Sequence, residues 1–310
     1  MVQREIINLV DKADIRSLSA LNPFISIAAI VSEWVIISTS IAIYCFFPNP
    51  LVYILVWALI GTRMYALYSL LHDGMHYLLF PDRKVNDWLC RLFLAWPLFI
   101  SLTKIRKAHL AHHQYLKTDQ DPEAAHLKYT EFQFPKPASE LIFTFTADLT
   151  GINFARYFLL RLRRVFIFRK KEDTKAAIGK HTLTTFIKIL YYTVVFSMII
   201  YMAWIIPFLI YWLIPYVTVF QVLNRLRLST EHFHIPEDKA FQTRTVRLNM
   251  IEQFIFSPHN LGFHAEHHIY PSVPFYRLGK LHKNLMTNTH YEKNIVVNKS
   301  YLDVIKEYVK

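Results

Sequence analysis

The chain has 310 residues, of which 53% are hydrophobic and only 19% are charged. This apolar content is above that of ordinary soluble domains, and it excludes an intrinsically disordered chain. Two cysteines and six glycines exclude a disulfide scaffold, a cysteine-based zinc module and a collagen-like repeat. What remains is an integral membrane protein or an unusually apolar globular one, and a net charge of +12 has to lie outside any hydrocarbon layer.

Four stretches are long and apolar enough to cross about 30 Å of hydrocarbon as helices, which takes roughly 20 residues each. They are residues 22–47, 51–71, 183–206 and 207–223. Pro48 and Pro50 separate the first two, and Pro207 separates the last two, so the sequence predicts two tight helical hairpins. A shorter apolar run over residues 88–102 contains Pro97, and we expect it to be buried or re-entrant.

The basic residues are distributed unevenly about these spans. Lys and Arg number 3 before the first span, 18 in residues 72–182 and 12 after residue 224, whereas the two hairpin tips carry none. The positive-inside rule then predicts that both termini and both large polar segments are cytosolic. No secretory signal peptide is expected in the first 20 residues, because charges interrupt them throughout.

These features predict an all-α membrane protein. We expect one domain over residues 1–310, with four transmembrane helices in two hairpins and a cytosolic helical cap from residues 72–182 and 224–310. Two charges lie inside the first hairpin, Glu33 about 16 residues before the turn at Pro48 and Arg63 about 14 residues after it. Since an unpaired charge at that depth is costly, Glu33 and Arg63 are predicted to pair.

Most of the 15 histidines fall into clusters. The three clusters are His72 and His76; His109, His112 and His113; and His264, His267 and His268. Residues four apart share a helix face, so His72 and His76 can bind one ion. In the second cluster His109 and His112 are predicted to share a face. His113, rotated by about 100°, then suits a second ion or the other side of the first.

Eight imidazoles are too many for one ion and suit two. The predicted topology puts all three clusters on one side of the membrane, where they can converge. His232, which follows the fourth span, is predicted as a ninth ligand, with His234 and Asn260 as weaker candidates. The other histidines, His126, His181, His259, His282 and His290, are expected to be ordinary surface residues.

Carboxylates near the clusters are candidates for accepting the outer ring N–H of metal-bound histidines. These are Asp73, Asp119, Asp121, Glu231 and Glu266.

The three clusters, taken in order, resemble the histidine boxes of the integral-membrane fatty acid desaturase superfamily, which also contains hydroxylases and ketolases. The stretch from Lys107 to Glu123 is similar to the region of the second box, and the stretch from Asn260 to Pro271 to that of the third. The resemblance covers about residues 50–290. The set of three boxes is a specific signal, whereas any single box is weak.

The resemblance implies a di-iron centre held almost wholly by histidine, with O2 as co-substrate and an acyl chain or similar lipid as substrate. The superfamily's additional histidine ligand corresponds to His232. No fused cytochrome b5 domain is recognisable, so a separate electron carrier of the ferredoxin or cytochrome b5 type is expected to dock on the basic cytosolic face. Desaturation of a fatty acyl chain is the main expectation, with hydroxylation or ketolation of a lipid or carotenoid as the alternative.

Two other classes of protein fit less well. A histidine-rich metal transporter would place ligands near the bilayer midplane, whereas the predicted spans are almost free of histidine. A membrane zinc hydrolase would favour an HExxH arrangement, whereas Asp73, Gly74 and Met75 separate the histidines of the first cluster. A scaffold role would leave the three clusters unexplained.

Overall fold

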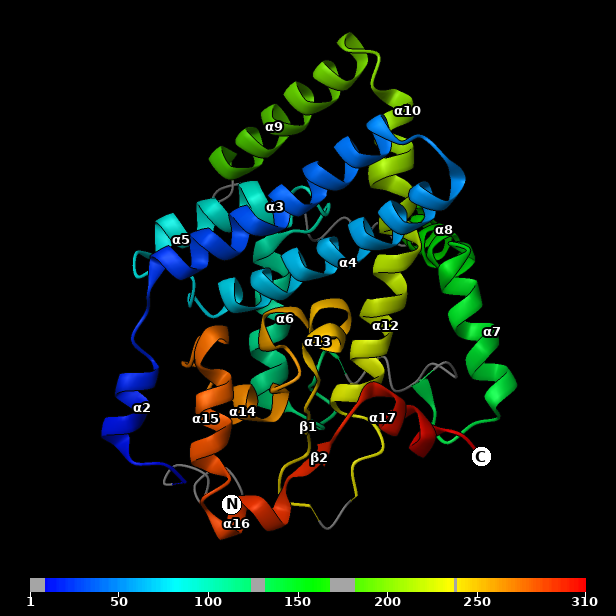
Figure 1. The fold of residues 1–310 in the computed structure, drawn as a ribbon. Helices are drawn as coiled ribbons and strands as arrows, with labels where there is room; N and C mark the ends of the chain where they lie inside the picture. The colour runs from blue at the N-terminus through cyan, green and yellow to red at the C-terminus, as the bar shows by residue number, and fades with distance from the viewer. Residues whose placement is uncertain (1–8, 124–131, 168–181, 237–238) are drawn as a thin grey trace.

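A computed structural model describes residues 9–123, 132–167, 182–236 and 239–310. Helices dominate this part of the chain, and its only strands form a two-stranded parallel sheet. Four helices are long and apolar enough to cross a membrane within the described ranges, as the sequence predicts. Figure 1 shows α3, α9 and α10 in its upper part, with α6, α14 and α15 on the other side of α4.

The first two spans are α3 (Pro23–Phe46) and α4 (Pro50–Met75). Each begins at an asparagine whose side chain accepts a hydrogen bond from the first turn, Asn22 from the Phe24 N–H and Asn49 from the Val52 N–H. A proline follows each cap at the first helical position, where its missing N–H costs nothing. The two helices are joined by three residues and pack against each other.

The third span is α9 (Thr182–Tyr201), and the fourth is a run of helix over Ile205–Glu231. This run comprises α10 (Ile205–Phe208), the π-helical turn η6 (Leu209–Leu213), α11 (Ile214–Val217) and α12 (Val219–Glu231). The predicted boundaries of 206 and 223 were therefore wrong. Pro207 fits within the first turn of a new helix, and the chain breaks before it, where Ala203 has a φ of 55°.

A chain segment without a spanning helix connects the second span to the second histidine cluster. It contains α5 (Arg83–Cys90), the π-helical turn η2 (Arg91–Ala95) and α6 (Leu102–Tyr115). Leu94, Ala95, Trp96 and Leu98 are fully or almost fully buried in the main core, so the centre of the short apolar run is buried, while Phe93 and Phe99 are exposed.

The remaining elements lie before the first span, between the second histidine cluster and the third span, and after the fourth span. Near the N-terminus lies α2 (Lys12–Leu18), and α7 (Ala138–Leu149) and α8 (Ile152–Ile167) precede the third span. After the fourth span come β1 (Arg244–Val246), α13 (Met250–Phe256), η7 (Pro258–Asn260), α14 (His264–Ile269), η8 (Phe275–Arg277), α15 (Leu278–Leu285), α16 (Thr289–Asn294), β2 (Val296–Asn298) and α17 (Tyr301–Tyr308). Strands β1 and β2 pair with Thr245 opposite Val297.

The close packing of α4 against α12 depends on Gly61. A Cβ atom at Gly61 would lie 2.4 Å from the Cβ of Val219, which is far inside van der Waals contact. Because α4 carries the first histidine cluster and α12 leads to His232, this close approach helps to set the distance between two parts of the site.

Glu33 and Arg63 form the predicted pair. Arg63 donates from Nη1 to Glu33 Oε2 at 3.1 Å, and both side chains are almost completely buried. The arginine also donates to the carbonyl of Phe254 and lies over the Phe254 ring, 3.6 Å from its centroid. The two charges therefore compensate each other inside the apolar bundle, and they also hold α13.

Candidate metal centre

All nine histidines predicted as ligands meet in one region of the structure. His72 lies in the last turn of α4, and His76 caps that helix. Helix α6 supplies three rings and α14 supplies three more, while His232 caps α12. Five of the nine are buried and four are partly buried. Each helix therefore presents its histidines at or near an end, where they face the other elements.

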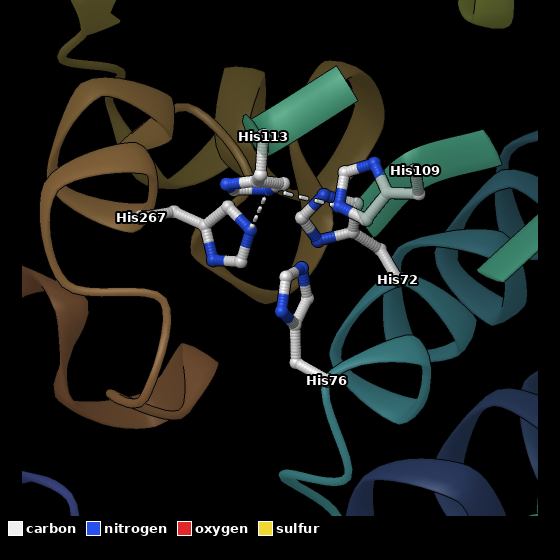
Figure 2. A group of neighbouring side chains, drawn as sticks. All are labelled: His72, His76, His109, His113 and His267. Carbon is white, nitrogen blue, oxygen red and sulfur yellow. Dashed lines mark hydrogen bonds between the residues drawn. The ribbon is translucent and has the colours of Figure 1, made fainter. Parts of the chain in front are cut away.

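The first group contains five imidazoles, whose possible ligand nitrogens all lie within 4.8 Å of one another. Figure 2 shows its members, His72, His76, His109, His113 and His267. His113 Nε2 lies 3.1 Å from both His109 Nε2 and His267 Nε2. The Nε2 atoms of His72 and His76 are buried, and neither has a hydrogen-bond partner among the described residues.

The second group contains four imidazoles, His112, His232, His264 and His268. His232 Nε2 lies 3.0 Å from His112 Nε2 and 2.9 Å from His264 Nε2. His264 Nε2 is also 3.0 Å from His268 Nε2. The rings of His113 and His268 stack with centroids 4.1 Å apart, so the two groups are direct neighbours.

The two HxxHH clusters divide between the groups in a way that corrects the sequence prediction. His109 shares its group with His113 and not with His112. In the third cluster His264 likewise shares its group with His268, while His267 joins the other group. Residues four apart differ by about 40° around a helix and residues three apart by about 60°, so the i,i+4 pair presents its rings more nearly together.

Two histidines of the second group have their outer nitrogens held by oxygen acceptors. His112 Nδ1 lies 3.0 Å and 3.1 Å from the two carboxylate oxygens of Asp121. His232 Nδ1 lies 3.3 Å from the carbonyl oxygen of Gln242. Since a carboxylate and a carbonyl only accept, the proton of each neutral ring is assigned to Nδ1, and Nε2 keeps a lone pair.

This assignment indicates that the second group is built for a cation. The Nε2 lone pairs of His112 and His232 face each other at 3.0 Å, which is repulsive unless a positive charge lies between them. Nitrogen donors bound side by side at about 2.1 Å from one ion would be about 3 Å apart. The four rings therefore fit a metal ion, and the unpartnered Nε2 atoms of the first group fit a second.

Burial keeps several of the clustered imidazoles neutral. It lowers the pKa of His76 to about 4, with the positive charge of Arg106 as a smaller cause. Burial, followed by the neighbouring imidazoles, also lowers the pKa of His109, His113 and His267 well below the ordinary value for histidine. The same holds for the pKa of His268, so lone pairs remain available at neutral pH.

The five carboxylates named from the sequence have different roles. Asp121 contacts His112 as predicted, and Glu231 Oε1 lies 3.3 Å from His264 Nδ1. Asp119 is exposed, and the structure gives it no ring contact. Asp73 instead accepts from the backbone N–H of Phe275 at 2.7 Å.

Glu266 is fully buried, and its contacts lie away from the clustered rings. His282 Nδ1, Tyr291 Oη and Thr245 Oγ1 contact its carboxylate at 2.5, 2.8 and 2.7 Å. These hydrogen bonds hold α14 in place on the side away from the clustered rings. His282 was therefore predicted wrongly as a surface residue, and so was His259, whose Nε2 lies 2.9 Å from Glu33 Oε1. The predictions for His126 and His181 lie outside the described residues, while His290 is exposed as expected.

Two weaker ligand candidates point elsewhere. Asn260 accepts from Gln253 and donates to the carbonyl of Phe275, and it belongs to neither imidazole group. The ring of His234 lies near that of Tyr308.

Sequence reasoning also missed Glu123, whose carboxylate oxygens lie 3.7 Å from His112 Nε2 and 3.9 Å from His109 Nδ1. The one sequence signal that could have identified Glu123 is its place at the end of the motif that follows the second cluster.

The sequence was also compared with known families. The model of the fatty acid desaturase family matches residues 48–299, which include all nine clustered histidines. The chain belongs to the fatty acid desaturase family. The described residues include four apolar helices long enough to span a membrane, and both imidazole groups lie inside the matched region.

Two relatives are desaturases by name. The chain is 27% identical over 251 residues to the dihydrorhizobitoxine desaturase of Bradyrhizobium elkanii. The matched region covers 78% of this chain and 70% of that protein. It is 23% identical over 279 residues to the chloroplastic omega-3 fatty acid desaturase of Brassica napus, covering 83% of this chain and 66% of that one. The relatives share the reaction named for the family but are named for different substrates.

Proposed function

We propose that this desaturase-family protein uses O2 and two iron ions to introduce a double bond into a fatty acyl chain. The observation that carries the proposal is the arrangement of nine imidazoles in two adjoining groups, with Nε2 atoms about 3 Å apart. We assign one iron to the five rings of the first group and one to the four rings of the second. Bound iron would supply the redox chemistry that breaks an unactivated C–H bond, which side-chain acids and bases cannot do.

The surrounding residues would hold the ligands in place and exclude water. Asp121 fixes the tautomer and the orientation of His112, and the Gln242 carbonyl does the same for His232. Glu231 forms an ion pair with Arg227, whose Nε lies 2.6 Å from Glu231 Oε1, so its charge near His264 is balanced. The ligand set is thus preorganised by contacts that do not themselves involve metal.

The orientation and the electron source also belong to the proposal. The concentration of Lys and Arg in the two large polar segments supports termini and an active site on the cytosolic side. We propose one membrane domain over residues 1–310, to which an acidic carrier of the ferredoxin or cytochrome b5 type delivers electrons. Basic surfaces attract such carriers at low ionic strength.

The alternative within the family is hydroxylation or ketolation of a lipid with the same ligands. The names of both relatives favour desaturation. A metal-transport role is less well supported, because the clustered rings lie in the last turn and cap of α4, at the cap of α12, and in α6 and α14, and not along the middle of the spans.

A lipid profile of cells that express the chain tests the proposed reaction. Cells making the wild-type protein are expected to contain an unsaturated species that is absent from cells making His267→Ala at equal protein level. A hydroxylated or keto species would select the alternative activity. An unchanged profile for all lipids, with the iron-loaded protein and a reductase system present, would contradict an activity on lipid chains.

A further inference from the structure

A cavity of about 650 Å³ lies within the membrane-spanning part of the molecule, apart from the histidine groups. Its walls come from α3, from the turn after η2, from α9 and from the first half of the fourth span. Ile210 on this wall accepts a hydrogen bond at its carbonyl from Tyr53, in the first turn of α4. His72 lies 19 residues further along α4, which corresponds to about 28 Å.

The surface that lines the cavity is mainly apolar. Trp34 Nε1 donates to the Phe93 carbonyl, Tyr192 Oη donates to the Trp96 carbonyl, and Trp212 Nε1 donates to the Pro97 carbonyl. The polar atoms of these aromatic side chains are therefore occupied by the buried segment, and the Trp34 and Trp212 rings stack on each other at the wall, so mainly carbon lines the cavity. A polar ligand would lose its hydrogen bonds to water without replacement here.

Helix α9 leaves an apolar space between itself and the rest of the bundle. Its outer face is exposed at Ile189 and Ile200, as expected of a helix that faces lipid, and its inner face packs on the core through a few aromatic residues. Val195 and Ile199, on the inner face, border the cavity. Water does not fill an apolar space of this kind favourably, whereas hydrocarbon does. At roughly 30 Å³ for each water-sized group, the cavity has room for about twenty methylenes.

We propose that this cavity is a lipid-binding site, which holds an acyl chain of a bilayer phospholipid as a non-reacting ligand between α9 and the rest of the bundle. Of the lining residues of α3, Trp34 is the one next to Glu33, so the buried Glu33–Arg63 ion pair lies at that end of the apolar space. Arg63 precedes His72 by nine residues on α4, about 14 Å, and a buried pair of charges there is a poor neighbour for an acyl chain that would continue to the metal centre. The bound chain is therefore a structural ligand and is separate from the substrate.

Lipid retention tests this site without measuring catalysis. The wild-type protein, purified in detergent, is expected to keep about one phospholipid per chain by native mass spectrometry and solvent extraction. Ile199→Trp fills the cavity and is expected to lose that lipid. Ile200→Trp, on the exposed face of α9, is the matched control and should retain it. Val195→Phe provides a second filling variant if Ile199→Trp fails to fold, with metal content as the check of folding.

The opposite results would overturn the proposal. If both filling variants fold and keep as much lipid as the wild type, the phospholipid is bound elsewhere. If the wild type retains none, the site has no stable occupant. If an added acyl substrate displaces the lipid and the filling variants lose turnover, the cavity belongs to the substrate. The first two results measure lipid retention alone and do not depend on whether the protein is a desaturase.

Discussion

His259 and Glu33 lie 226 positions apart in the sequence, yet the ring Nε2 of one is 2.9 Å from a carboxylate oxygen of the other. Glu33 receives the Arg63 guanidinium on its second oxygen. His259 has a left-handed backbone with a φ of 56° and lies five residues before His264. Two membrane helices are thus linked through one carboxylate to the segment that leads into the third histidine cluster.

Breaking this link is expected to destabilise the protein and to loosen the metal centre. Arg63→Ala leaves a buried carboxylate without its main partner, which typically costs about 3–5 kcal/mol. Thermal unfolding in detergent should show a clear decrease of the midpoint, together with weaker metal binding. The double variant Glu33→Gln/Arg63→Met removes both charges and should recover most of the stability. A double variant that is less stable than Arg63→Ala would contradict the pairing.

The contact between Asp121 and His112 is expected to control metal affinity. Asp121→Asn removes the charge that fixes the His112 tautomer, and such changes cost roughly 10–100-fold in metal affinity. Competition with a chelator followed by metal analysis measures this loss. Asp119→Asn, two positions away and exposed, is the control and should bind metal as the wild type does. Equal affinity in the two variants would exclude this role for Asp121.

The close approach of α4 to α12 predicts a specific pattern at Gly61. Gly61→Ala places a methyl group against Val219 and is expected to cost about 1–3 kcal/mol through overpacking. Adding Val219→Ala should restore only a part of the loss, because it removes the Cγ1 atom that would lie 2.6 Å from the new methyl group but keeps the Val219 Cβ at 2.4 Å. Gly279→Ala is the control: its new Cβ would meet only Phe263 at 3.7 Å, and unfolding should change little. A loss at Gly279 as large as at Gly61 would remove the argument from close packing.

The stability of the metal-free protein is expected to decrease in acid. In the unfolded chain a histidine has a pKa near 6.5, whereas burial lowers the folded pKa of His76 to about 4. Above about pH 6.5 both states are neutral and this contribution is complete. Between pH 6.5 and about 4 the unfolded chain gains protons that the folded state excludes, so stability falls.

Unfolding midpoints measured across this pH range check the acid sensitivity. His76→Gln should give a shallower dependence on pH than the wild type, while His290→Gln, at an exposed position, should not change it. A wild-type midpoint that stays constant from pH 7 to pH 4.5 would contradict the neutral state of the buried rings.

Local spacing made much of this architecture predictable. The apolar runs indicated four spans, and the spacing of the histidines identified eight of the nine clustered rings, because helix geometry brings such residues to one face. His232 was predicted from its place after the fourth span and from the family resemblance. The pairing of Glu33 with Arg63 followed from their equal distance to the hairpin turn. These are short-range consequences of periodicity.

The contacts that were missed join distant parts of the chain. His259 gave no local signal, since Glu33 comes near it only when the segment before the third cluster packs on the first two spans. His282 meets Glu266 only because α15 packs on α14, which the spacing of these two residues does not show. The division of His109 and His112 between the two groups required the small difference between 40° and 60° around α6. The fourth span begins two residues before the predicted start, because Pro207 fits in the first turn of α10. Its helix also continues to Glu231, because α12 extends past residue 223, where the apolar run of the sequence ends.

Metal content tests the central claim most directly. Protein expressed with iron available, purified without chelator and analysed for all transition metals, is expected to contain about two irons per chain, since two imidazole groups are present. His267→Ala and His264→Ala, one from each group, should both reduce the iron content while the four helices remain folded. One zinc ion per chain without iron, or wild-type iron content in both variants, would contradict the account.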